Sequence, residues 1–247
     1  MVTSVKEDYA YLLHRVPYRD QSVLAHFLTQ ANGKVSAVIN GIKSTKNNRR
    51  ALLQSTRQLR VSYTLKPGLS RLTLLELADS QPTVPNVSYF LFYQYMNELL
   101  LTILPEQLPS KTIYNSYSNS LALLNQDQPH SALRQIEMAL IEQFDDLPDL
   151  TTTVDTQEQI KANCHYFFHP EHGVWSINQT GRQHYFLGSQ LLAFNQLINN
   201  RDDCGHLLPD EAIAKEAKPV TRHLIDQLLN GKSLKTRTAF KDLRHYL

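Results

Sequence analysis

The residues of this chain best suited to chemistry are four cations close together in a segment without carboxylates. The segment "NGIKSTKNNRRALLQ" runs from residue 40 to 54 and holds Lys43, Lys46, Arg49 and Arg50. So many ammonium and guanidinium groups suit the binding of a polyanion, and the alternative is a polar loop that serves only solubility. The wider segment favours the polyanion, because the stretch between Asp20 and Glu76 holds nine lysines and arginines and no acidic residue. Phosphate contacts are also expected from cations that flank the loop: Lys34, Arg57 and Arg60.

Charge is segregated along the whole chain. The 247 residues have a formal net charge of only +2, but residues 1–80 hold 12 basic and 5 acidic residues, and residues 81–217 hold 6 basic and 16 acidic ones. Residues 218–247 return to 7 basic against 2 acidic. This distribution predicts a basic face for nucleic acid and a separate acidic body.

A search for catalytic motifs does not indicate an enzyme. "NGKSLK" contains the Gly-Lys-Ser end of a phosphate-binding loop, but Asp226 stands where that loop needs its first glycine, and the preceding segment is expected to be helical. A nucleophile elbow, a His-Glu-x-x-His motif and a glycine-rich dinucleotide fingerprint are all absent from the sequence. We expect no catalytic residue and no cofactor.

One cluster has the residue types of a metal site. "CHYFFHPEHG" places Cys164, His165, His169 and His172 within nine residues. Thiolate and imidazole suit zinc, but no Cys-x-x-Cys pair occurs and Cys204 is the only other sulfur ligand. The alternative is a surface hairpin rich in histidine, and we therefore predict no metal.

The first 80 residues have the pattern of strands. Five segments are predicted to be strands: "YAYLLH", "SVLAHFLT", "KVSAVIN", "RQLRVSYTLK" and "RLTLLEL". Asn32-Gly33 is a strong hairpin signal, and in the fourth segment Leu59, Val61, Tyr63 and Leu65 alternate with polar residues. Five short strands in about 75 residues favour a five-stranded OB barrel, with an SH3-like barrel as the rival.

After residue 80 the period becomes helical. Helices are expected over 87–104, 110–126, 131–144, 189–199, 209–229 and 235–247, and a hairpin over 165–178 within a less regular stretch, 145–187. The predicted fold class is α+β: an OB domain over 1–80, then a mostly helical domain over 81–247.

Four segments carry a specific resemblance: "AYLLHRVPYRDQSVLAHFLTQANGKVSAVINGIK", "YMNELLLTILP", "ALRQIEMALIEQF" and "NGKSLKTRTAFKDL". In this order, and over nearly the full length, they resemble the RecO family of bacterial recombination and repair proteins. The resemblance implies an N-terminal OB domain and a helical C-terminal domain. It also implies binding of single- and double-stranded DNA, annealing of complementary strands, displacement of single-stranded-DNA-binding protein and, with RecR, loading of RecA.

The resemblance also implies a docking site for the acidic, hydrophobic C-terminal tail of single-stranded-DNA-binding protein. The arginine of the family's Ala-Leu-Arg motif takes part in it, and that position is Arg134 here. A guanidinium beside an apolar groove suits a carboxylate and an aromatic residue. The alternative for Arg134 is an ion pair with Glu137, one helical turn away.

The chain departs from the family pattern in places. Some members carry a four-cysteine zinc site after the third helix, where this chain has only Cys164, which implies that structural zinc is lost. Ser55 replaces a proline after the basic loop. In the tail, Ser233 and Thr236 replace proline and serine, while three cations expected to extend the DNA surface remain: Lys232, Lys235 and Arg237.

Two other functions stay open on the sequence. The acidic helical body could act as a protein-interaction scaffold, or the barrel could bind RNA through contacts to the 2′-hydroxyl. Two cysteines form no disulfide framework, and the N-terminus and apolar stretches suggest neither a signal peptide nor a membrane span. We expect a cytoplasmic, nucleoid-associated protein.

Overall fold

The computed structural model describes residues 3–41, 49–53, 56–78, 87–145, 147, 150–176, 185–202 and 206–244, with the backbone alone for residues 49, 50, 87 and 241–244. The chain forms two compact units. The first contains residues 1–121 and 234–247, and the second contains residues 122–233. The first unit therefore contains α2 (Phe90–Ile103), most of α3 (Lys111–Asn125) and α8 (Lys235–Arg244) as well as the strands, and the predicted domain division at residue 80 stays a prediction.

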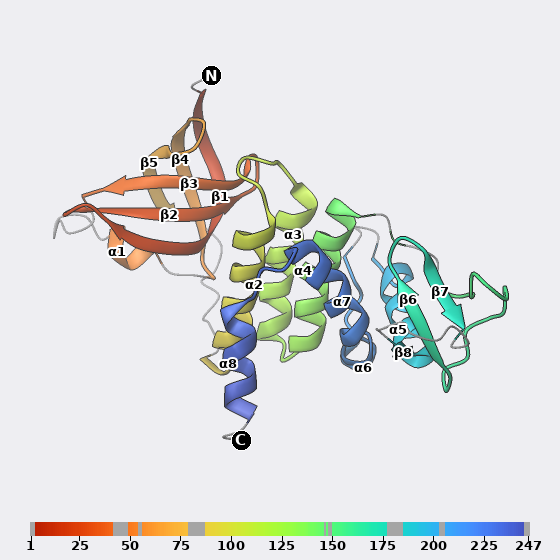
Figure 1. Cartoon of the computed structure of the whole chain (residues 1–247). Helices are drawn as coiled ribbons and strands as arrows, with labels where there is room; N and C mark the ends of the chain where they lie inside the picture. Colours follow the sequence, from red (N-terminus) through yellow and green to blue (C-terminus); the bar gives the residue numbers. More distant parts are fainter. Residues whose placement is uncertain are drawn as a thin grey trace. The chain divides into compact units, whose positions relative to one another are not determined.

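Five strands of the first unit close into a barrel (Figure 1). Their order around the barrel is β1-β2-β3-β5-β4, and the strands are β1 (Thr3–Tyr18), β2 (Ser22–Thr29), β3 (Gly33–Asn40), β4 (Gln58–Leu65) and β5 (Ser70–Leu77). All pairings are antiparallel except that of β3 with β5, where Ala37 lies opposite Ser70. The short helix α1 (Arg49–Leu52) lies between β3 and β4 in the chain. The predicted α+β fold with an N-terminal five-stranded barrel is confirmed.

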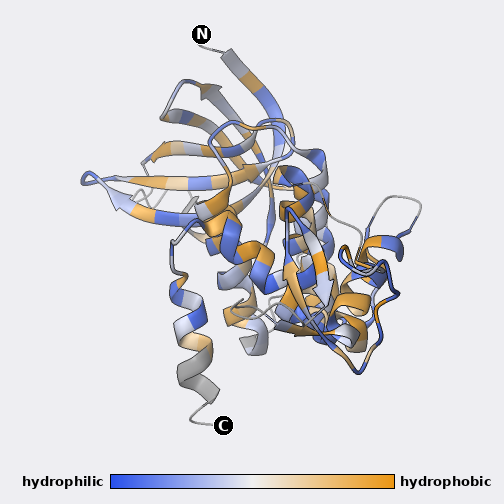
Figure 2. Ribbon diagram, turned by 45° about the vertical axis from the view of Figure 1, so that its right-hand side comes forward, coloured by the Kyte–Doolittle hydropathy of each residue, from blue (hydrophilic) through white to orange (hydrophobic). Residues whose placement is uncertain are grey.

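Alternation of side chains builds the barrel core. On β4, Leu59, Val61 and Tyr63 are buried, whereas the residues between them are only partly covered. Figure 2 shows the same alternation of apolar and polar residues along the barrel strands. Because successive side chains of a strand point to opposite faces, one face fills the interior and the other remains available outside.

The predicted Asn32-Gly33 hairpin joins β2 and β3. Gly33 has a φ of +65°, which glycine adopts without steric penalty, and it pairs with Thr29. The Thr29 hydroxyl accepts a hydrogen bond from the Asn32 N–H. A Cβ at Gly33 would lie 1.8 Å from the Leu108 carbonyl oxygen, so close backbone packing also requires glycine here.

Among the described residues, three longer helices besides α1 belong wholly or partly to the first unit. The 3₁₀ turn η1 (Val87–Tyr89) leads into α2 (Phe90–Ile103), followed by α3 (Lys111–Asn125), whose residues from Ala122 onward count with the second unit. The last helix, α8 (Lys235–Arg244), packs on α2 through Phe240, whose ring lies edge-on to Phe92 at 5.2 Å between centroids.

The second unit combines helices with a small sheet. It contains α4 (Pro129–Phe144), α5 (Gly188–Asn199), α6 (Glu211–Glu216) and α7 (Lys218–Leu229), and a sheet of order β7-β6-β8. The strands are β6 (His165–His169), β7 (Gly173–Ser176) and β8 (Tyr185–Leu187). The hairpin predicted over 165–178 is therefore confirmed as β6 and β7.

Two predictions for the second unit are wrong in detail. The single helix expected over 209–229 is divided at Ala217 into α6 and α7. Pro219 has no backbone N–H to donate within a helix, which is tolerated in the first turn of α7 but would disrupt an uninterrupted helix. The strand β8 was missed. Within the described residues, no helix is long and apolar enough to cross a membrane.

Candidate nucleic-acid interface

The basic loop falls largely outside the described residues. Lys43 and Lys46 lie outside them, and so do the side chains of Arg49 and Arg50, whose backbone begins α1. The helix α1 ends at Leu52, and β4 begins at Gln58. The contact of these cations with phosphates stays a prediction.

Lys34 is placed differently from the sequence prediction. It is 8% exposed, and its Nζ donates a hydrogen bond of 2.9 Å to the Leu101 carbonyl oxygen and lies 3.7 Å from Glu106 Oε1. Burying a lysine is costly unless its charge is paired, and these two acceptors supply the pairing. Lys34 therefore holds the barrel against α2 and the segment that follows it, and we remove it from the proposed phosphate contacts.

The other predicted barrel cations, Arg57 and Arg60, lie at β4. Arg57 precedes the strand and is partly buried, while Arg60 is on the outer face and forms an ion pair with Glu76 of β5 at 2.5 Å. The residue opposite Arg60 on β1 is Tyr9, an aromatic residue that is 44% exposed. A guanidinium beside an exposed ring is a suitable surface for a phosphate and a stacked base.

The outer surface of the barrel also has cations that were not singled out from the sequence. The exposed ones are Lys6, Arg15, Arg19, Lys66 and Arg71. The sequence pattern could have identified at least Arg71, because it lies at an outward position of a strand with alternating apolar and polar residues. Among the aromatic residues, Phe27 and Tyr63 belong to the core, whereas the Tyr18 ring lies 5.3 Å from the Arg19 guanidinium in a cation–π contact.

The basic tail is divided between the two units. Lys232 is exposed at the end of the second unit, while Lys235 and Arg237 are on α8 in the first. The Glu98 carboxylate of α2 accepts hydrogen bonds from the backbone N–H groups of Lys235 and Thr236, at 2.8 and 2.9 Å, and from the Thr236 hydroxyl at 2.6 Å. Partial burial acts to raise the pKa of Glu98, but these hydrogen bonds outweigh it and leave the pKa below its usual value.

Comparison with known proteins identifies the family of this chain. The model described as "Recombination protein O N terminal" matches residues 1–81, and "Recombination protein O C terminal" matches residues 87–238. The chain belongs to the RecO family. Proteins named DNA repair protein RecO are similar over nearly their full length. The one from Alteromonas mediterranea is 32% identical over 94% of this chain and 95% of its own, and the one from Marinobacter nauticus is 33% identical over 97% and 96%.

The position implied for peptide docking in the RecO family, Arg134, is in the interior of the second unit. It is 2% exposed, forms an ion pair with Glu137 on the same helix, and donates a hydrogen bond of 3.3 Å from Nη1 to the Ala214 carbonyl oxygen of α6. The alternative weighed on the sequence, an ion pair one turn away, is thus present. Since Arg134 is buried, the surface groove expected beside it is not seen, and its docking role stays a prediction.

The cysteine and histidine cluster is divided by the hairpin. Cys164 and His165 lie before and at the start of β6, and His169 lies at its end. Four residues of extended strand span about 13 Å, too far for one metal ion to be shared. Cys164 is an exposed free cysteine, and Cys204 lies outside the described residues.

Proposed function

We propose that this chain is a DNA-binding repair protein that acts as a recombination mediator. In this proposal the barrel binds the backbones of single- and double-stranded DNA and promotes annealing of complementary strands. With RecR, the protein helps RecA to load onto DNA that is coated by single-stranded-DNA-binding protein. Membership of the RecO family supports the assignment to DNA repair, and the annealing and loading steps are the finer part of the proposal.

The observation that carries the proposal is a closed five-stranded barrel, most of whose strands come from a segment without carboxylates. Between Asp20 and Glu76, nine cations and no acidic residue occur, and this segment supplies β2, β3, β4 and most of β5. Since the apolar residues of these strands face the core, polar and charged residues are available on the outside. Such a surface binds phosphates by releasing condensed counterions.

Contacts to phosphates explain how such a protein could anneal DNA. Cations on the barrel would reduce the repulsion between two strands, while the base edges remain free to pair because phosphate contacts read no sequence. The Tyr9 ring, opposite Arg60, would hold a base by stacking. None of these steps needs a catalytic residue.

The experiment that tests the proposal measures DNA affinity against salt concentration. A fluorescent single-stranded oligonucleotide is titrated with wild-type protein and with a loop variant in which Lys43, Lys46, Arg49 and Arg50 are changed to alanine. The slope of log affinity against log salt should be about −0.7 per neutralised phosphate, so losing four contacts should make the slope shallower by up to about 2.8. The control variant changes two exposed cations of the second unit, Lys161→Ala and Arg222→Ala, and should keep the wild-type slope.

Each other result would point to a different conclusion. An unchanged slope in the loop variant would exclude the loop and direct the same test to Arg57, Arg60 and Arg71. A change in the control variant about half that of the loop variant, in proportion to the two and four charges removed, would indicate a response to net charge alone. If the wild type did not bind at low salt, the proposal would be wrong and a scaffold would be favoured, and preference for RNA of equal length would favour an RNA-binding protein.

A further inference from the structure

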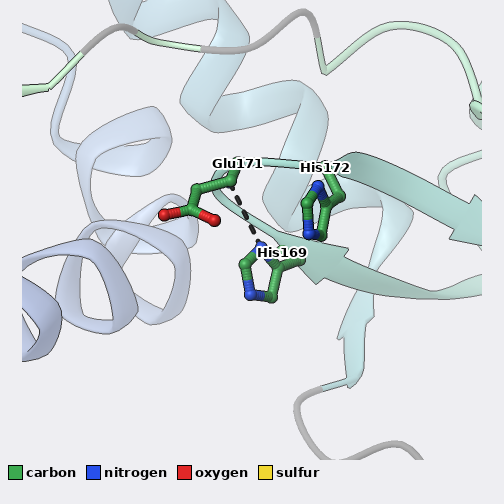
Figure 3. A group of neighbouring side chains, drawn as sticks. All are labelled: His169, Glu171 and His172. Carbon is green, nitrogen blue, oxygen red and sulfur yellow. Dashed lines mark hydrogen bonds between the residues drawn. The ribbon is translucent and has the colours of Figure 1, made fainter.

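The turn between β6 and β7 brings together three side chains that can bind a metal ion. Potential ligand atoms of His169, Glu171 and His172 all lie within 4.8 Å of one another. Figure 3 shows the two imidazole rings side by side at the end of the hairpin, with the Glu171 carboxylate beside the His169 ring. All three side chains are at least partly exposed, so an ion from solution can reach them.

The local sequence explains why these residues meet. The His172 N–H donates to the His169 carbonyl oxygen at 3.1 Å, which closes a four-residue turn with Pro170 in its second position. The fixed φ of proline favours that position, and the first and last residues of such a turn have Cα atoms less than about 7 Å apart. Gly173, with a φ of +77°, then returns the chain into β7 and pairs with His169.

The turn is held by contacts that do not use the ligand atoms of His172 or Glu171. The Trp175 indole N–H donates to the His172 carbonyl oxygen at 3.1 Å. The Val154 N–H donates to the Val174 carbonyl oxygen at 2.7 Å, which attaches a second segment to β7. A metal site on this turn would therefore rest on an ordered backbone, and only side chains would need to adjust.

We propose that His169, Glu171 and His172 form a binding site for one divalent transition-metal ion of the zinc type. Two imidazoles and one carboxylate suit Zn²⁺, Co²⁺ and Ni²⁺, and one negative charge favours a cation. This donor set contains no sulfur and is distinct from the Cys164 and His165 pair at the other end of β6. The site does not depend on DNA binding.

The geometry requires a modest rearrangement on binding. Two ligand atoms on a tetrahedral zinc ion lie about 3.4 Å apart, because each metal–ligand bond is about 2.0–2.1 Å. The free chain holds the donors at up to 4.8 Å, and the imidazole rings are stacked at 4.6 Å between centroids with planes 19° apart. Since a ligated metal lies in the plane of each ring, at least one ring must rotate.

Metal binding at His169 Nδ1 would also require the loss of a hydrogen bond. This nitrogen accepts a hydrogen bond of 3.2 Å from the Glu171 N–H, so a metal ion at Nδ1 must displace that bond. This exchange is feasible because the bond is long and lies at an exposed turn.

The test is a titration of the untagged full-length chain, freed of metal by a chelator, with Zn²⁺ followed by calorimetry and with Co²⁺ followed by visible absorption. We expect one ion per chain and a rise in melting temperature that a chelator reverses. His172→Ala and Glu171→Gln should each weaken affinity by at least about 10-fold, because each removes or weakens one of only three protein ligands. The controls His165→Ala and Cys164→Ser change nearby potential ligands outside the group and should bind as the wild type does.

Three results would overturn the proposal. They are the absence of binding by the wild type at millimolar metal, wild-type affinity in folded His172→Ala, and loss of binding in either control. Circular dichroism of each variant without metal separates loss of the site from loss of the fold, and Glu171→Gln provides a second variant that keeps the size of the side chain.

Discussion

Replacing Glu98 with glutamine should release the start of α8 from α2. The carboxylate accepts three hydrogen bonds, two of them from backbone N–H groups of Lys235 and Thr236 that have no partner within the helix. Loss of a capping side chain costs about 0.5–2 kcal/mol, and hydrogen bonds to a charged group are each stronger than neutral ones. Glutamine keeps one acceptor oxygen and the site is partly open to water, so we expect a loss of about 1–2 kcal/mol.

Hydrogen exchange of the α8 amides is the suitable assay, because it reports local opening that global unfolding can miss. A loss of 1–2 kcal/mol corresponds to a roughly 5–30-fold drop in protection. Glu7→Gln removes an exposed carboxylate of the same unit and should leave α8 unchanged.

The pKa of Glu98 is lowered in the folded chain, so the contribution of its carboxylate to stability depends on pH. That contribution is complete above the unfolded pKa, about 4.3, and is lost as the pH falls through the folded pKa. Wild type and Glu98→Gln should therefore converge in acid. Protection within twofold of wild type at neutral pH, or a difference that persists in acid, would refute the reasoning.

Two further pairs of variants test the packing. Gly33→Ala should destabilise the chain by more than about 2 kcal/mol in thermal unfolding, because its positive φ and the Leu108 carbonyl oxygen both oppose a Cβ. Gly68→Ala, which shares a positive φ but has open space, should cost only about 1–2 kcal/mol, and equal losses would contradict the steric argument. Arg134→Met should cost about 3–5 kcal/mol in urea unfolding, because it leaves the Glu137 carboxylate buried without its cation. Adding Glu137→Leu should recover most of that loss, and a double variant no more stable than the single one would contradict this account.

The strands could be predicted because their signals are local. On β4, the alternation of Leu59, Val61 and Tyr63 with polar residues requires only the two-residue period of a strand. The turn at Asn32-Gly33 likewise depends on adjacent residues. Closure of the barrel depends on distant pairings, such as Ala37 with Ser70, and was predicted only from the number of strands.

What could not be predicted is the burial of individual charges. Lys34 and Arg134 have the same chemistry as cations at the surface, and the backbone acceptors of their buried side chains lie far away in sequence: Leu101 for the first and Ala214 for the second. β8 was missed because its three residues are too short to establish a period. The place of α8 beside α2 depends on Glu98, which is 138 residues from Thr236 and gives no signal of its role in the sequence.

Exposure, rather than the presence of an ion pair, decides which cations remain candidates for phosphate contacts. Arg60 is paired with Glu76, but both side chains are more than 40% exposed, and such surface pairs contribute only about 0–1 kcal/mol. A phosphate could replace Glu76 at little cost. Releasing buried Lys34 would break its contacts with Leu101 and Glu106. Alanine at Arg60 should therefore weaken DNA binding with little effect on stability. Alanine at Lys34 should lower stability and leave the salt dependence of binding unchanged, which a comparison of the two variants in both assays would test.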